Sequence, residues 1–158
     1  MSRIQSGGMV PLFDRLGLDK EKYDGISNNF LTPDGVEQSI LFELNKLATT
    51  RSRLTFKKFV DNDLTVLDYG LPDFTGFSAQ NDEHRRLVKS AIKKAVEHYE
   101  PRLRDVNVSI ISSSSKKHIS LFGIDATILL GNEFQRVSFP LSNTNKSSKF
   151  NNNKEMIK

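Results

Sequence analysis

The chain has 158 residues, which is enough for one domain with a buried core. It has no cysteine, which excludes a disulfide framework and a thiolate metal site, and it lacks the run of about 18 apolar residues that a membrane helix needs. The net charge is +4, but four lysines against one glutamate in residues 142–158 supply +3 of it. The rest of the chain is close to neutral, which argues against a nucleic-acid-binding domain.

Both ends of the chain are polar. Residues 142–158 are rich in Asn, Lys and Ser, and so polar a segment cannot offset its ordering entropy by burial. We therefore expect a flexible segment 1–8, one folded domain over 9–141 and a disordered tail over 142–158. No signal-peptide pattern opens the sequence, so we expect the protein to be cytoplasmic.

Residues 9–16 form a short apolar stretch that predicts one turn or a short helix. Leu12, Phe13 and Leu16 share a helical face, and Gly17 would end the helix. Two interpretations stay open: the stretch folds back onto the domain, or it docks on a partner.

Two long helices are predicted from apolar periodicity. The first starts at Thr32 as N-cap with Pro33 next, and its apolar stripe continues to about Thr49. The second covers about 82–99 and is stopped by Pro101. Its expected solvent-facing residues are Arg85, Arg86, Lys89, Lys93, Lys94 and Glu97.

Between the helices, residues 54–80 read as an irregular segment, and a loop of that length in a compact domain is often functional. It contains the run Tyr69-Gly70-Leu71-Pro72-Asp73-Phe74. The apolar members of this run are predicted to pin the loop to the core, with Gly70 available for a positive φ angle. A contact surface for a partner is the alternative role of the run.

After Pro101 the apolar period changes to two, which predicts strands. The apolar residues alternate over 106–110, over 122–130 and from 137 onward, with turns between them. Sequential strands joined by short connections form an antiparallel sheet, so the predicted fold class is α+β, with the two helices packed on a three-stranded meander.

Four stretches in order resemble the TssE family, the baseplate-wedge proteins of type VI secretion systems, which are related to a phage tail wedge protein once labelled lysozyme. The stretches are 11–16, 39–51, 66–74 and 99–103, the last followed by the strand 122–126. Ala48 and Thr49 depart from the family pattern, where a Leu and an Asn are usual, and the long tail is outside the family core.

The resemblance implies a non-enzymatic structural protein without cofactor or metal, which binds other wedge subunits and sheath protein and helps to start the contractile sheath. It also implies that Glu100, Pro101 and Arg102 contact the core bundle of the wedge, with Leu12, Phe13 and Leu16 as further candidate contacts. Small-molecule, nucleic-acid and membrane partners are not expected.

The residues themselves leave the role of this Glu-Pro-Arg corner open. Pro101 fixes the backbone where the second helix ends, and the Arg102 guanidinium can bind a carboxylate or carbonyl groups. A contact with a partner and an internal Glu–Arg brace are both consistent with this pattern. An exposed edge of the sheet is a further candidate contact, since free edges accept an added strand.

An enzymatic and a regulatory function are the two alternatives. Glycoside hydrolysis needs two carboxylates, and Asp68, Asp73, Glu100 and Asp125 are candidates, but a chain with 19 acidic residues contains such candidates whatever its function. His84, His98 and His118 follow no metal-binding or catalytic motif and read as surface residues. A protein-binding regulatory adaptor on the same fold is the remaining alternative.

Overall fold

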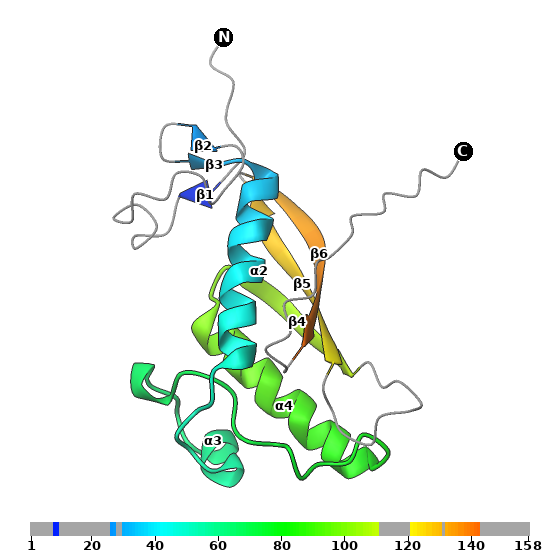
Figure 1. Cartoon of the computed structure of the whole chain (residues 1–158). Helices are drawn as coiled ribbons and strands as arrows, with labels where there is room; N and C mark the ends of the chain where they lie inside the picture. The colour runs from blue at the N-terminus through cyan, green and yellow to red at the C-terminus, as the bar shows by residue number, and fades with distance from the viewer. Residues whose placement is uncertain (1–7, 10–25, 28–29, 111–120, 131, 143–158) are drawn as a thin grey trace, which may run out of the picture.

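The structure is a computed structural model that describes residues 8–9, 26–27, 30–110, 121–130 and 132–142. It has the predicted α+β architecture, in which helices pack on a three-stranded antiparallel sheet (Figure 1). In chain order the elements are β1 (Gly8–Met9), β2 (Ile26–Ser27), β3 (Phe30–Leu31), α2 (Pro33–Thr49), α3 (Phe56–Asp61), the 3₁₀ turn η2 (Val66–Asp68), α4 (Asp82–Tyr99), β4 (Leu103–Ile110), β5 (Leu121–Leu130) and β6 (Glu133–Ser142).

Both long helices begin at a capping side chain, which for α2 is the predicted Thr32. The Thr32 side chain accepts a hydrogen bond from the Gly35 amide, and Pro33 occupies the first turn of α2. The Asn81 side chain caps α4 in the same way. The predicted spans of the two helices, 33–49 and 82–99, are thus confirmed.

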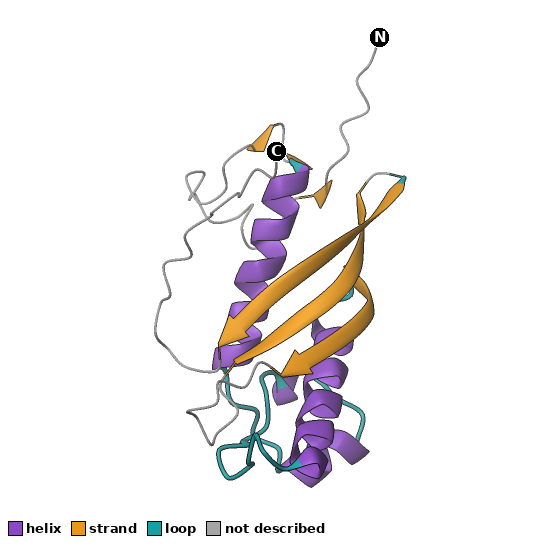
Figure 2. Ribbon diagram, turned by 90° about the vertical axis from the view of Figure 1, so that its right-hand side faces the viewer, coloured by secondary structure: helices purple, strands orange, loops and turns teal. Residues whose placement is uncertain are grey.

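The main sheet has the order β4-β5-β6 and forms one layer, with α2 and α4 both behind it in Figure 2. β5 and β6 pair continuously from Leu121↔Ser142 to Leu130↔Glu133. β4 pairs with β5 less regularly, because a bulge lies between Arg104 and Asn107. Alternate residues of the strands face the helices and fill one hydrophobic core.

Several details differ from the prediction. The segment expected to be irregular contains α3 and η2, which apolar periodicity does not reveal because both are shorter than two helical turns. Three two-residue strands form a second small sheet in the order β1-β3-β2, and it includes Gly8 and Met9. β6 continues through Ser142, one residue into the predicted tail. The predicted helix over 9–16 otherwise lies outside the described residues, as do residues 1–7 and 143–158.

None of the helices in the described ranges is long and apolar enough to span a bilayer.

Candidate functional site

The loop between α2 and α4 is closed at its base by two backbone hydrogen bonds. The Leu71 amide donates to the Thr50 carbonyl at 2.9 Å, and the Ser52 amide donates to the Leu71 carbonyl at 2.9 Å. Arg51 and Leu71 form a parallel β-bridge. We call this pair of hydrogen bonds the clasp; it joins the end of α2 directly to the Tyr69–Phe74 run.

Gly70 is required by the clasp. Its φ angle is +112°, in the region that favours glycine. A Cβ atom at this position would lie 2.6 Å from the Thr50 carbonyl oxygen and 2.9 Å from the Ser52 amide nitrogen. Because both are backbone atoms held in the clasp, neither can move aside without breaking it.

The rest of the Tyr69–Phe74 run lies mostly in the core. Leu71, Pro72 and Phe74 are buried, and Tyr69 is half-buried. Asp73 is exposed and accepts a hydrogen bond from the Thr75 amide at 3.0 Å, which holds the pKa of this carboxyl below its usual value. The run therefore anchors the middle of the loop against the domain.

Tyr69 links the loop to the end of α4. Its ring meets the ring of Tyr99 edge to face, with centroids 5.1 Å apart. Burial, followed by the nearby carboxylates of Glu43 and Glu100, raises the pKa of Tyr69 to about 12. The structure thus brings together the loop run and the Glu-Pro-Arg corner, which are about 30 residues apart in the sequence.

The η2 turn is held by a dense set of polar contacts. Asp68 is buried and accepts hydrogen bonds from the Thr65 hydroxyl at 2.7 Å and the Thr65 amide at 3.1 Å. It also pairs with Arg53, with 3.0 Å between Oδ1 and Nε. The Tyr99 hydroxyl donates to the Thr65 carbonyl at 2.8 Å, so the turn is fixed to α4 as well.

Lys94 fixes the chain just before this turn. Its ammonium donates to the carbonyls of Val60 at 2.7 Å and Asn62 at 2.6 Å, so it binds the end of α3. The prediction that Lys94 faces solvent is therefore wrong. A helical-wheel pattern does not reveal such a contact, because the partners lie in an irregular segment.

On this fixed turn, two neighbouring aliphatic side chains project into solvent. Val66 is 85% exposed and Leu67 is 71% exposed. Isolated surface apolar residues are common, but here two adjacent ones sit on a turn held by side chains from two other segments, the chain after α2 and the end of α4. We call this pair the Val66–Leu67 knuckle. The pair lies in the family-like stretch 66–74, and no pattern in that stretch predicts its exposure.

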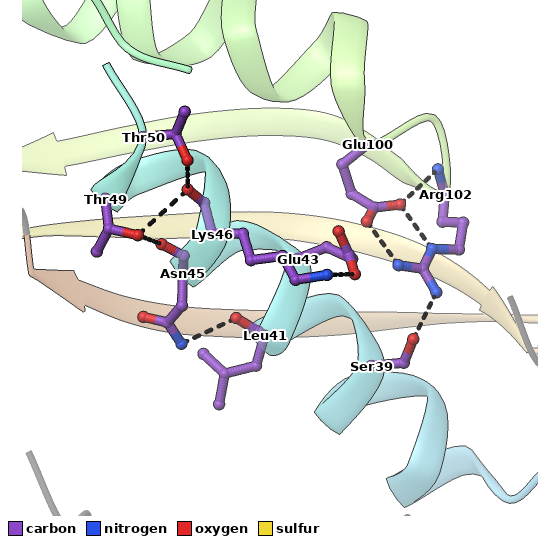
Figure 3. Close-up of polar contacts among 9 residues, drawn as sticks. All are labelled: Ser39, Leu41, Glu43, Asn45, Lys46, Thr49, Thr50, Glu100 and Arg102. Carbon is purple, nitrogen blue, oxygen red and sulfur yellow. Dashed lines mark hydrogen bonds and ion pairs between the residues drawn. The ribbon is translucent and has the colours of Figure 1, made fainter. Parts of the chain in front are cut away.

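The Glu-Pro-Arg corner follows directly after Tyr99. The Glu100 carboxylate is only 4% exposed and receives two bonds of 2.6 Å from the Arg102 guanidinium, through Nε and Nη2 (Figure 3). Arg102 Nη1 also lies 3.1 Å from the hydroxyl of Ser39, which is buried in α2. The pair therefore connects the end of α4, the start of β4 and the middle of α2.

The outer side of the corner is accessible. Pro101 is exposed, and the Arg102 side chain is 33% exposed. Beside them lies an open hollow of about 280 Å³, whose lining includes Pro101, Arg102, Val36 and Ile128. The corner thus braces the fold internally and also presents a mixed polar and apolar hollow at the surface.

The other candidate residues are spread over different elements. Asp68 and Glu100 are each paired with an arginine, whereas Asp125 lies on β5 and accepts a hydrogen bond from Ser138 at 2.6 Å. His84 is half-buried and accepts a hydrogen bond from the Ser78 amide, so it is a surface residue only in part. Leu12, Phe13, Leu16 and His118 lie outside the described residues. Within the described ranges, no group of three or more His, Cys, Asp or Glu residues could hold a metal ion.

The contacts of Asp68 predict a loss of stability in acid. Hydrogen bonds from Thr65, followed by Arg53, hold the pKa of Asp68 below its usual value of 3.8 in the folded protein. A group with a lowered folded-state pKa stabilises the fold above its unfolded pKa and loses that contribution as the pH falls through the folded one. We expect Asp68→Asn to be less stable at pH 7 and to lose less stability than the wild type between about pH 5 and pH 3.

Urea denaturation at a series of pH values measures this effect. Asp63→Asn is the matched control, since Asp63 is an exposed carboxylate in the same loop with no ion pair or hydrogen bond to the described residues. Equal pH dependence of the Asp68→Asn variant and the wild type would contradict the prediction.

Together these features define a small α+β domain in which a clasped loop and a braced corner present a knuckle and a hollow at the surface. The family model described as "Baseplate wedge protein gp25" matches residues 34–133, so the chain belongs to this family of structural baseplate proteins. The match spans α2, the clasped loop, α4 and the sheet up to the start of β6. The resemblance to baseplate wedge proteins predicted from the four stretches is confirmed.

Two solved structures resemble the chain at low TM-scores. One belongs to the baseplate complex of the type VI secretion system, with 16% identity, 68% of this chain and 93% of that chain covered, and a TM-score of 0.48. The other is a Geobacter sulfurreducens protein described as a tail lysozyme, with 18% identity, 71% and 95% covered, and a TM-score of 0.37. No curated protein matches the sequence. Because these identities and TM-scores are low, the chain is assigned to the baseplate wedge family on the family match alone.

Proposed function

We propose that this protein is a non-enzymatic subunit of a type VI secretion baseplate wedge, which binds other wedge subunits and helps to start assembly of the contractile sheath. The observation that carries the proposal is the family match over residues 34–133. The four family-like stretches of the sequence favour the type VI branch, whose baseplate would assemble on the cytoplasmic side of the secretion apparatus.

The proposed contact with the wedge is the surface at the end of α4. Tyr99 joins its two parts, because its hydroxyl holds Thr65 just before the knuckle while its backbone leads into the corner. The knuckle offers apolar side chains on a turn whose backbone has little freedom left to lose on binding, which is how a preorganised contact gains affinity. The hollow beside Pro101 and Arg102 offers room for a side chain of the partner.

For the sheath, the proposed contact is a free edge of the main sheet. β4 is interrupted by a bulge in which Asp105 has a φ angle of +51°. A bulge disrupts the regular row of backbone donors and acceptors that an added strand would pair with. β6 pairs regularly along its whole length, and Pro140 near its end removes one backbone donor. The more regular template for an added strand is therefore β6.

The carboxylates support a structural role over hydrolysis. A glycosidase acid needs a raised pKa, whereas the contacts of Asp68 lower its pKa. Glu100 is bound by the arginine two residues later. Hydrolysis of peptidoglycan by the purified protein, lost on substitution of a carboxylate, would contradict the non-enzymatic proposal.

The wedge contact predicts the behaviour of a knuckle variant. Val66→Ser/Leu67→Ser should fold with an unchanged melting temperature, because both side chains are exposed. It should nevertheless reduce co-purification with the other wedge subunits by about tenfold or more, as expected when a preorganised apolar contact is removed. Pull-down of the tagged full chain, co-expressed with those subunits, measures the effect.

Leu87→Ser is the control for this experiment, since Leu87 is a large exposed apolar residue on α4. It should leave co-purification unchanged. If the wild type does not co-purify with any wedge subunit, the proposed function is wrong. If the knuckle variant binds as well as the wild type, the contact lies elsewhere.

A further inference from the structure

The sheet face that points away from the helices is uncovered by any described element (Figure 2). Its side chains form rows across the strands, about 6.7 Å apart along each strand. At the end nearest the β5–β6 turn, Leu129 and Phe134 face each other directly and are 49% and 66% exposed. We call this surface the outer sheet face.

The next row is basic. Arg104, Thr127 and Arg136 lie side by side on the three strands, which places the two arginine backbones about 10 Å apart. Both arginines are exposed, and neither makes an ion pair or hydrogen bond with a described residue. Two unpaired guanidinium groups beside an exposed apolar pair are an uncommon combination on a surface with no partner.

The row after that has the opposite charge. Asp125 lies between Asn107 and Ser138 and accepts its hydrogen bond from Ser138, and Asp105 in the bulge is exposed and lines the same surface hollow as Asp125. The outer sheet face is therefore banded: apolar, then basic, then acidic. Such banding limits which partner can lie on it, because a segment of uniform charge is repelled by one of the two rows.

From these rows we infer that the outer sheet face binds an extended segment of another baseplate subunit, in which a carboxylate follows or precedes an apolar residue by two positions. The apolar side chain lies on Leu129 and Phe134, and the carboxylate bridges Arg104 and Arg136. The i, i+2 spacing of a strand matches the spacing between the rows. This inference rests on the proposed baseplate function and adds a surface that adjoins the corner, because Arg104 and Leu129 also line the hollow beside Pro101 and Arg102.

Two other occupants fit the charges less well. The chain's own residues 142–158 carry four lysines against one glutamate, so they would bring positive charge to the basic row. A second copy could place its acidic row on the basic row, but it would then bury Phe134 against Ser109 and Pro140 instead of against a large apolar side chain. The acidic and apolar segment satisfies both rows at once.

Photo-crosslinking in the assembled wedge tests this inference. The full chain, with p-benzoyl-phenylalanine in place of Phe134, is co-expressed with the other wedge subunits, and the adducts are mapped by mass spectrometry. We expect one main adduct, in a segment of another subunit with a carboxylate two residues from an apolar residue. Arg104→Glu/Arg136→Glu should reduce its yield about tenfold, because the row then repels the carboxylate.

The control is Arg86→Glu/Lys89→Glu, which makes the same change in charge on the exposed side of α4 and should leave the yield unchanged. An adduct in residues 143–158, in a second copy or in a segment without carboxylates overturns the inference, as does a yield that Arg104→Glu/Arg136→Glu does not lower. A wedge that forms without any adduct at position 134 overturns this inference alone. A wild-type chain that joins no wedge overturns the proposed function and this inference with it.

Discussion

Replacing Gly70 with alanine should destabilise the fold by about 3–5 kcal/mol, which combines the cost of a left-handed non-glycine residue with that of overpacking. The new methyl group would stand 2.6 Å from the Thr50 carbonyl oxygen, against backbone that cannot retreat without opening the clasp. Since small domains have only about 5–15 kcal/mol of stability, the variant should unfold at a much lower urea concentration. Equilibrium urea denaturation, followed by circular dichroism, measures the shift.

Gly76→Ala is the matched control for this prediction. Gly76 lies in the same loop, and an added Cβ there meets no atom within 4 Å. This variant should be as stable as the wild type or slightly more stable, because alanine restricts the unfolded chain. Similar midpoints for the two variants would show that the clasp contributes little to the fold.

Arg102→Ala should be the second most disruptive change, at about 2–4 kcal/mol. It would leave the Glu100 carboxylate, 4% exposed, without its two guanidinium bonds. The expected loss of folding free energy is smaller than for a fully buried ion pair, because the Arg102 side chain is one-third exposed. Thermal and urea unfolding of the isolated protein measure the loss.

A double-mutant cycle isolates the brace from other effects of the substitution. Glu100→Gln/Arg102→Ala should be more stable than the two single losses would predict together, since neither partner then leaves an unpaired charge. Arg102→Lys should recover part of the stability, because it keeps the charge but not the two-pronged geometry. If Arg102→Ala is as stable as the wild type yet no longer joins the wedge, the corner acts by direct contact and the internal brace is unimportant.

The elements that sequence predicts well are those with strong local signals. Thr32 and Pro33 mark the start of α2, and Pro101 marks the end of α4, because caps and proline act on the backbone within a few residues. The alternation after residue 105 likewise predicts the main sheet. Gly70 could be assigned a positive φ angle because few other residues tolerate one.

What sequence does not predict depends on contacts between distant segments. Lys94 binds carbonyls more than 30 residues away, and Ser39 binds Arg102 across 63 residues. The exposure of Val66 and Leu67 cannot be predicted for the same reason. An apolar pair in a loop is expected to be buried, but the contacts of Asp68, Arg53 and Tyr99 hold this turn so that both side chains face solvent. The banding of the outer sheet face appears only once the strand register is known.

The clasp separates the parts of the loop that maintain the fold from the part that reaches solvent. Its two hydrogen bonds are made by backbone atoms of residues 50, 52 and 71, and the knuckle side chains contribute to neither of them. Substitutions at Val66 and Leu67 can therefore accumulate over evolution with little effect on stability. Related chains could change which partner they recognise by drift at these two positions while the rest of the domain stays the same.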